Sequence, residues 1–178
     1  FETAMVQLGG HAINLAPGAI QLGAHETIED TAVVLGRMCD MIMSRADRHE
    51  SIEALAKYAN VPVINGMSDR VHPTQGVGDM ITVFDHWPTG KRPNELKFIF
   101  VGDATQVCNT LCDITTKLGF NFVHYGPDNH RITDEWLEIG RRNALKYGGS
   151  CEWTDNPDCL KGADFIYTDV WYGLYDKE

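Results

Sequence analysis

The sequence lacks an excess of positive charge. It carries 15 Lys and Arg residues against 25 Asp and Glu residues, which gives a formal net charge of −10 at pH 7 and a pI near 5.0. Nucleic acids and anionic membranes attract basic surfaces, so we predict that the chain binds neither. The sequence also lacks any apolar run that approaches the roughly 18 residues of a membrane span, and it contains no internal repeat.

A paired cysteine pattern is absent as well. The five cysteines are an odd number without regular spacing: Cys39, Cys108, Cys112, Cys151 and Cys159. This pattern indicates reduced thiols and a cytoplasmic protein rather than a disulfide framework. Cys108 and Cys112 lie one helical turn apart, but no His or second Cys pair accompanies them. We therefore interpret them as packed thiols and predict no metal site.

Strand patterns alternate with helix patterns along the chain. Short apolar runs bounded by Gly, Pro or Asn indicate buried strands, whereas apolar residues at helical spacing indicate amphipathic helices. Strands are expected at 13–15, 41–45, 63–64, 97–101, 120–125, 151–154 and 165–168, and helices at 1–10, 28–39, 51–59, 73–86, 107–118, 133–147 and 158–161. The alternation predicts an α/β fold with two Rossmann-like domains on parallel sheets, covered by helices on both faces.

The segment 87–93 is the best candidate for a domain boundary. It contains Pro88, Gly90 and Pro93, and both residue types interrupt regular structure. We therefore predict a first domain of residues 1–88 and a second domain of residues 94–178.

Polar residues gather where the strand at 63–64 meets the next helix. Asn65-Gly66 is expected to end the strand, and Pro73 suits the first helical position. His72 and Gln75 therefore lie at one helix N-terminus, where unpaired N–H groups favour an anion or a polarised carbonyl oxygen. Without further context, a His at such a position is more often a cap or a solvated side chain.

Apolar residues recur at helical spacing after Pro73, namely Val77, Met80, Ile81 and Phe84. We expect this face of the helix to pack inward and to hold the polar site in place.

Three arginines are candidates for binding a phosphate, because the guanidinium group has a fixed charge and a planar fork of donors. Arg45 follows the strand at 41–45, at the end where ligands bind in open α/β sheets. Arg48 and Arg70 are alternatives, or ordinary surface charges.

The second half of the chain begins with a strand, a turn and a helix of the Rossmann kind. The turn is Gly102-Asp103-Ala104-Thr105-Gln106. A dinucleotide fingerprint needs glycines where Ala104 and Val107 stand, and the Val107 side chain prevents the close approach that the last glycine allows. We therefore reject NAD binding and expect no cofactor.

Five stretches that together span nearly the whole chain resemble the aspartate and ornithine carbamoyltransferase family: 21–30 (QLGAHETIED), 31–45, 72–75 (HPTQ), 102–106 (GDATQ) and 163–175 (ADFIYTDVWYGLY). The resemblance implies the carbamoyltransferase fold and a transferase activity. The chain begins just after the place of the family's Ser-Thr-Arg-Thr phosphate loop and stops before its His-Cys-Leu-Pro segment. We therefore expect an internal fragment, incomplete at both ends, with little or no turnover by itself.

The resemblance also implies roles for residues of the first half. Arg45 would neutralise the phosphate of carbamoyl phosphate, and His72 would donate a hydrogen bond to its carbonyl oxygen. Gln75 would fix the carbamoyl amide. Gln21 would lie on a loop that closes the site of a neighbouring subunit in a homotrimer; from the residues alone, this loop is an ordinary solvated one.

For the second half, the resemblance implies an amine site with Asp169 and Gln106. Gly173, Leu174 and Tyr175 stand where the ornithine enzymes carry Ser-Met-Gly, which helps to bind the amino-acid end of ornithine. Burying a carboxylate without polar partners is costly, so these residues favour a diamine. Within the family, the chain most resembles the members that act reversibly on putrescine, in agmatine degradation. The alternatives are an ornithine enzyme and a non-catalytic fragment with the same fold.

Overall fold

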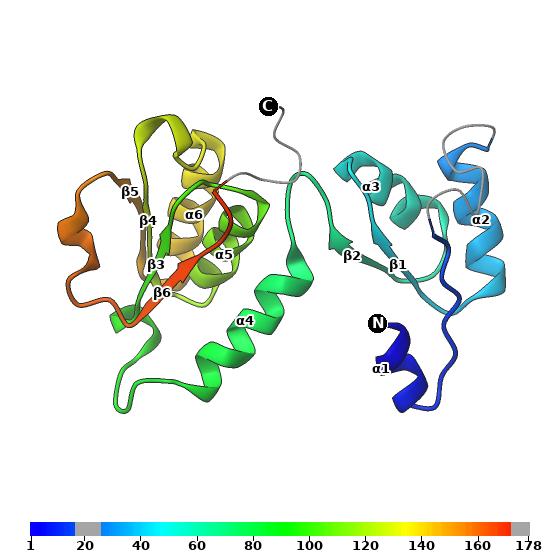
Figure 1. Cartoon of the computed structure of the whole chain (residues 1–178), viewed down its shortest axis with the longest axis horizontal. Helices are drawn as coiled ribbons and strands as arrows, with labels where there is room; N and C mark the ends of the chain where they lie inside the picture. The colour runs from blue at the N-terminus through cyan, green and yellow to red at the C-terminus, as the bar shows by residue number, and fades with distance from the viewer. Residues whose placement is uncertain (17–25, 172–178) are drawn as a thin grey trace. The chain divides into compact units, whose positions relative to one another are not determined.

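The computed structural model describes residues 1–16 and 26–171 (Figure 1). They form two compact units, one of residues 1–42 with 53–63, and one of residues 43–52 with those from 64 onward. The predicted domain division between residues 88 and 94 lies inside the second unit and stays a prediction.

The first unit has a small core between α2 (Ile28–Met38) and α3 (His49–Tyr58). Ala32, Leu55 and Ala59 are buried there and pack together. Gly36 permits the close approach, because a Cβ atom at that position would lie 1.6 Å from the carbonyl oxygen of Ala59.

The structure confirms the predicted start of α2 but not the strand predicted at 13–15. Thr27 caps α2 by accepting a hydrogen bond from the backbone N–H of Asp30 at 3.1 Å. Residues 11–16, which follow α1 (Glu2–Gln7), have no regular structure, and Ile13 and Leu15 are exposed. A three-residue apolar alternation without a neighbouring strand has no ladder to join, so the prediction is wrong.

The strands β1 (Ile42–Arg45) and β2 (Val63–Met67) form a two-stranded sheet. The N–H of Ile42 donates to the carbonyl of Pro62 at 3.0 Å, and the N–H of Ala46 donates to that of Met67 at 3.1 Å. From the first hydrogen bond to the second, the residue numbers increase on both strands, as they do in a parallel pair.

Strand β2 runs through Asn65 and Gly66, so the prediction that these residues end it is wrong. Gly66 provides a close approach between strands instead of a turn, because a Cβ atom there would lie 2.6 Å from the Met43 sulfur. The chain turns only after Met67, whose φ of 154° is rare for a residue with a side chain. The Asn65 side chain accepts the Met67 N–H at 2.9 Å and stabilises this bend.

A four-stranded parallel sheet organises the second unit. Its strands are β3 (Lys97–Val101), β4 (Asn121–Tyr125), β5 (Ser150–Thr154) and β6 (Phe165–Thr168), in the order β5-β4-β3-β6 (Figure 1). The chain passes outward from β3 to β5 and then returns to the other side of β3. The carboxyl ends of β3 and β6 therefore form a topological switch point, where open α/β sheets bind ligands.

Three helices pack with one face of this sheet, namely α4 (Pro73–Asp85), α5 (Gln106–Lys117) and α6 (Asp134–Tyr147). Their buried side chains join Phe98, Phe100 and Phe122 in a single core, which includes the predicted packed thiols Cys108 and Cys112. In Figure 1, α5 and α6 lie side by side next to the strands.

The inward face of α4 differs from the predicted one. Gly76, Met80 and Val83 are buried, whereas Val77, Ile81 and Phe84 are 55%, 59% and 51% exposed. The apolar pattern alone missed this face because its closest contact is made by a glycine, which carries no hydrophobic signal.

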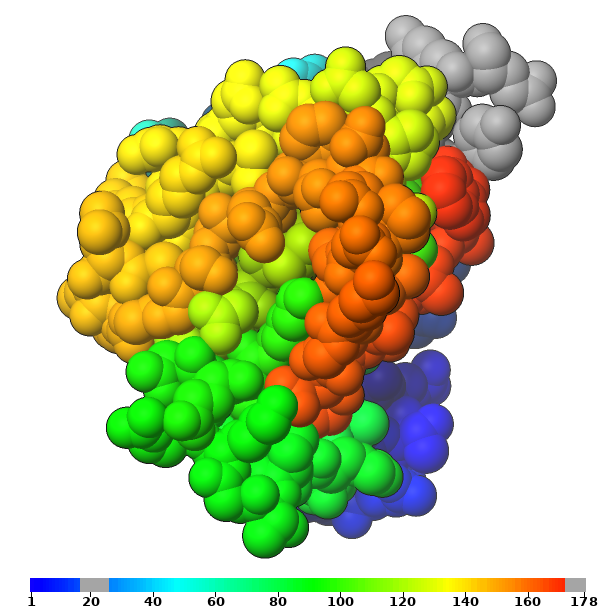
Figure 2. Space-filling model, turned by 90° about the vertical axis from the view of Figure 1, so that its left-hand side faces the viewer, coloured from blue at the N-terminus to red at the C-terminus, as the bar shows by residue number. Residues whose placement is uncertain are grey.

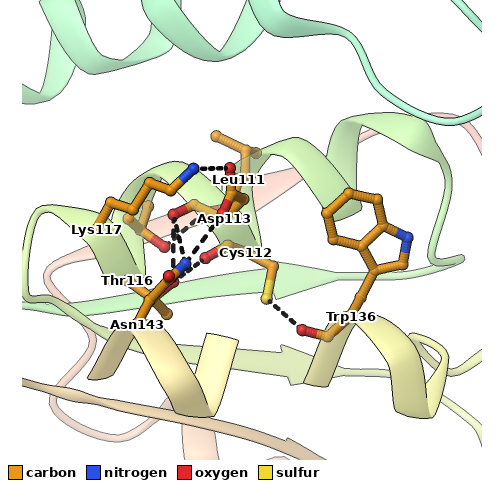
Figure 3. A network of polar contacts seen from close by, with 8 residues as sticks. Leu111, Cys112, Asp113, Thr116, Lys117, Trp136 and Asn143 are labelled. Atoms are coloured by element: carbon orange, nitrogen blue, oxygen red, sulfur yellow. Dashed lines mark hydrogen bonds and ion pairs between the residues drawn. The ribbon is translucent and has the colours of Figure 1, made fainter. Parts of the chain in front are cut away.

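A polar network connects α5 to α6 (Figure 3). The Asn143 side chain donates to the Asp113 carboxylate at 3.0 Å and to the Thr116 hydroxyl at 3.2 Å. Lys117 pairs with the other Asp113 oxygen at 2.6 Å. Because Asn143 is buried, these partners satisfy a polar side chain that would otherwise weaken the packing of the two helices.

Short 3-10 helices occur within the loops of residues 64–171: η1 (Pro93–Glu95), η2 (Asp128–His130) and η3 (Pro157–Leu160). The short helix predicted at 158–161 corresponds to η3. Figure 2 shows a face of the molecule on which α6, the edge strand β5 and η3 form one continuous surface.

Candidate functional site

His72 caps the N-terminus of α4 with its side chain. Its ring Nδ1 accepts the backbone N–H of Gln75 at 3.4 Å and lies 3.3 Å from the Thr74 hydroxyl. A backbone N–H can only donate, so Nδ1 is the acceptor and the neutral ring carries its proton on Nε2. The ring therefore retains one N–H donor for a ligand.

The surroundings of His72 favour this neutral form. Burial lowers the pKa of His72, and the positive charge of Arg45 lowers it further, against the opposing effects of Asp169 and Asp79. The predicted residues Arg45 and Asp169 thus each lie within electrostatic range of His72. A neutral imidazole is suited to donate a hydrogen bond to an oxygen that gains negative charge.

Helix α5 holds the backbone of His72 in place. The His72 N–H donates to the Thr110 hydroxyl at 2.8 Å, and that hydroxyl donates to the Gln106 carbonyl, also at 2.8 Å. Gln106, another predicted site residue, is buried, and its side-chain amide lies 3.8 Å from the sulfur of Met67. The first turns of α4 and α5 are therefore joined through one hydroxyl group.

The turn before His72 is organised by Ser68, which the sequence prediction missed. Ser68 is fully buried, and its hydroxyl lies 2.9 Å from Nδ1 of His49 and 3.3 Å from the N–H of Val71. The N–H of His49 in turn donates to Asp69 at 2.9 Å. These contacts attach the turn to the first turn of α3. A serine directly after a buried strand is the one available signal in the sequence.

Gln75 makes a contact that the sequence prediction also missed. Its side-chain Nε2 donates to Oδ1 of Asp79 at 2.8 Å, one helical turn further along α4. Burial raises the pKa of Asp79, and burial together with the Asp79 charge raises the pKa of Tyr167 to about 12. The spacing of four residues between a Gln and an Asp is the signal that could have identified this pair.

Asp169 follows β6, at the switch point of the sheet. The Thr168 hydroxyl donates to the Val101 carbonyl at 2.9 Å, which fixes the end of β6 against the end of β3. One carboxylate oxygen of Asp169 accepts the Val170 N–H at 2.8 Å. Asp169 therefore follows β6 directly, and Gln106 begins the helix that follows the neighbouring strand β3; their role in an amine site stays a prediction.

The candidate arginines differ in their partners. Arg70 pairs with Glu135 and lies over the ring of Trp136 at 5.3 Å, and Arg48 lies 3.6 Å from Glu50. In the part of the chain that the structure describes, Arg45 has no ion-pair partner. It therefore has the most freely available positive charge of the three.

Four predicted site residues lie outside the described residues: Gln21, Gly173, Leu174 and Tyr175. Within residues 1–16 and 26–171, no group of three or more His, Cys, Asp and Glu side chains is arranged to hold a metal ion. No helix in those ranges is long and apolar enough to cross a membrane.

Comparisons with known proteins give a consistent result along the chain. Residues 1–85 match the family model of the aspartate/ornithine carbamoyltransferase carbamoyl-P binding domain, and residues 94–178 match that of the Asp/Orn binding domain. A putrescine carbamoyltransferase of Mycoplasma capricolum is 44% identical over 186 residues, which cover 100% of this chain and 51% of the relative. An ornithine carbamoyltransferase of Thermotoga petrophila is 42% identical over 182 residues, which cover 100% of this chain and 57% of the relative.

Solved structures agree with the sequence comparisons. The ornithine carbamoyltransferase from Pyrococcus furiosus superimposes with a TM-score of 0.89 at 42% identity, over 96% of this chain and 54% of that chain. The anabolic enzyme from Campylobacter jejuni also gives a TM-score of 0.89, at 35% identity. The chain thus spans about half the length of the relatives it matches.

Proposed function

Because the chain belongs to the aspartate/ornithine carbamoyltransferase family, we propose that the complete protein transfers a carbamoyl group between carbamoyl phosphate and the primary amine of putrescine. In the forward direction the amine nitrogen attacks the carbamoyl carbon, the C–O bond to phosphate breaks, phosphate leaves and a proton is released. The reverse direction, phosphorolysis of carbamoylputrescine, uses the same groups and would serve agmatine degradation.

The observation that carries the proposal is the hydrogen bond from the Gln75 N–H to Nδ1 of His72. With Nδ1 occupied by the Gln75 N–H and the pKa of the ring lowered, His72 offers Nε2–H to a ligand. Its role is to polarise the carbamoyl carbonyl, not to act as a base. A positioned donor of this kind contributes roughly 10² to 10³ in rate.

Other residues bind and orient the two substrates. We propose that Arg45 neutralises the phosphate and that Gln75 binds the carbamoyl amide. Gln106 and Asp169 would line the amine site, where the Asp169 carboxylate attracts the ammonium group. Gln21 would close the site of a neighbouring subunit in a homotrimer, and residues 1–88 and 94–178 would be the carbamoyl-phosphate and amine domains.

The choice of putrescine rests on Gly173, Leu174 and Tyr175. By the family resemblance, these apolar and aromatic residue types would replace the polar partners that an α-carboxylate needs. The relatives do not decide between the amines, since an ornithine carbamoyltransferase of Pyrococcus horikoshii is also 44% identical, over 175 residues. Ornithine is therefore the second candidate.

The test is carbamoyl transfer by the full-length parent protein to putrescine and to ornithine, at fixed carbamoyl phosphate. We expect a strong preference for putrescine that weakens in Gly173→Ser. Arg45→Gln should raise the KM for carbamoyl phosphate, whereas the matched control Arg48→Gln should not. A preference for ornithine would overturn the substrate, and transfer to neither amine would overturn the activity. The 178 residues alone should show little or no turnover.

A further inference from the structure

We propose that Asp79 is a positioning residue that acts through Gln75, by holding the side-chain amide in the one orientation that presents its oxygen to the carbamoyl NH₂ group. This inference rests on the proposed function. It adds to that function a residue that does not touch the substrate and that neither the motif at 72–75 nor the predicted site includes.

The first support is the chemistry of the contact. Nε2 of Gln75 lies 2.8 Å from Oδ1 of Asp79, and an ionised carboxylate can only accept hydrogen bonds. The amide must therefore direct its NH₂ group to Asp79, which places Oε1 on the side away from the carboxylate. The Tyr167 hydroxyl also acts on this amide. A neutral partner that both donates and accepts would permit either orientation of the amide.

The second support is the position of the three side chains on α4. His72, Gln75 and Asp79 follow one another at intervals of three and four residues, so they lie along one face of the helix. His72 caps this helix and Gln75 occupies its first turn. Asp79 therefore lies one turn behind the two residues proposed to touch carbamoyl phosphate.

The third support is the unsatisfied second oxygen of Asp79. Oδ2 is buried and has no hydrogen-bond partner of normal geometry in the part of the chain that the structure describes. The Tyr167 hydroxyl lies close enough to favour the charged form of the carboxyl group. Buried polar atoms are rarely left unpaired, and those that are call for an explanation such as a role in the site.

The groups around Asp79 act on its carboxyl in both directions. Burial raises the pKa of Asp79 and the Asp169 charge adds to this, whereas Gln75, Tyr167 and His72 act in the opposite direction. A merely structural role would need only a side chain of this size and polarity. A positioning role needs the charge, because only the carboxylate enforces one orientation of the amide.

The test compares Asp79→Asn with Asp85→Asn in the full-length protein. Asp85 is an exposed residue of the same helix, so the second variant makes the same chemical change away from the site. Binding of phosphonoacetamide, which carries both a phosphonate and an amide, is measured by calorimetry beside binding of inorganic phosphate, which lacks the amide. These measurements require no turnover.

We expect Asp79→Asn to weaken phosphonoacetamide binding about tenfold, as the loss of one well-placed polar contact does. Phosphate binding should change less than twofold, and Asp85→Asn should change neither. In a Gln75→Ala background, Asp79→Asn should have no further effect on phosphonoacetamide. Equal losses for both ligands, or a full additional loss without Gln75, would overturn the inference.

Two further outcomes are distinguishable. A protein that binds phosphonoacetamide as expected but carbamoylates neither putrescine nor ornithine would overturn the proposed function and leave the role of Asp79 standing. If Asp79→Asn does not fold, Tyr167→Phe replaces it, because it removes a hydroxyl that acts on both Asp79 and Gln75 and leaves the rest of the side chain in place. A selective loss of phosphonoacetamide binding, smaller than tenfold, is then expected, and an unchanged affinity would overturn the inference.

Discussion

Gly76 and Gly78 lie two residues apart in α4 but in opposite surroundings. A Cβ atom at Gly76 would lie 2.6 Å from Cγ2 of Thr110, whereas a Cβ atom at Gly78 would have no atom within 4 Å. Thr110 cannot turn away, because it is buried and its hydroxyl is held between the His72 N–H and the Gln106 carbonyl. The same substitution at the two glycines should therefore have opposite effects.

The expected magnitudes follow from helix propensity and packing. Alanine is more favourable than glycine inside a helix by about 1 kcal/mol, so Gly78→Ala should raise the free energy of unfolding by about 0.5 to 1 kcal/mol. In Gly76→Ala the same gain is opposed by overpacking against Thr110, which typically costs about 1 to 3 kcal/mol. We expect Gly76→Ala to lower the free energy of unfolding by about 1 kcal/mol. The free energies of unfolding of the two variants should therefore differ by about 2 kcal/mol.

The assay is urea unfolding followed by tryptophan fluorescence. Trp87 and Trp136 lie in the same unit as α4, so the signal reports the part of the molecule that the substitutions affect. Thr110→Ser removes the methyl group but keeps the hydroxyl, and it should restore much of the stability that Gly76→Ala loses. Equal effects of the two alanines, or no rescue by the serine, would refute the proposed packing of α4 on α5.

Two further predictions concern the core of the second unit. Burial lowers the pKa of His124, so as the pH falls through the unfolded value of about 6.5 the unfolded chain binds a proton that the folded chain does not. The free energy of unfolding should therefore decrease below that pH, and His124→Gln should flatten the decrease in urea titrations at pH 7.5 and 5.5; an unchanged slope would contradict this. Gly140→Ala would place a Cβ atom 2.4 Å from the Cys151 sulfur, so a loss of about 1 to 3 kcal/mol is expected, and a neutral result in thermal melts would show that α6 does not pack this closely.

Much of the fold was predictable because the elements of this chain are well marked locally. The strands at 97–101 and 165–168 agree with the structure to the residue, as their apolar runs end at glycine or charged positions. Two of the errors involve glycines. Gly66 was expected to end a strand and Gly76 was not considered, but both are sites of close approach to a neighbouring element. Such contacts depend on tertiary structure, which local sequence patterns do not contain.

Candidate site residues could be named from the sequence, but their arrangement could not. His72 and Gln75 were recognisable from their motif and their place at a helix start. The link from His72 through Thr110 to Gln106 was not, because it joins residues 34 to 38 positions apart across two helices. Asp79 could have been predicted, since Gln and Asp side chains four residues apart on a helix are known to form hydrogen bonds.

Helix α4 explains why the site and the packing can be altered separately. Residues 72, 75 and 79 share one face and carry the polar groups, while Gly76, Met80 and Val83 form the neighbouring buried face. A glycine at the boundary between these faces lets the backbone of α5 approach closely enough for Thr110 to hold His72. A larger residue at 76 would shift the His72 cap together with the helix, whereas we expect a change at 79 to reorient the Gln75 amide and leave the packing intact. The two sets of variants described above therefore separate the stability of α4 from the orientation of the polar side chains that we propose to bind the ligand.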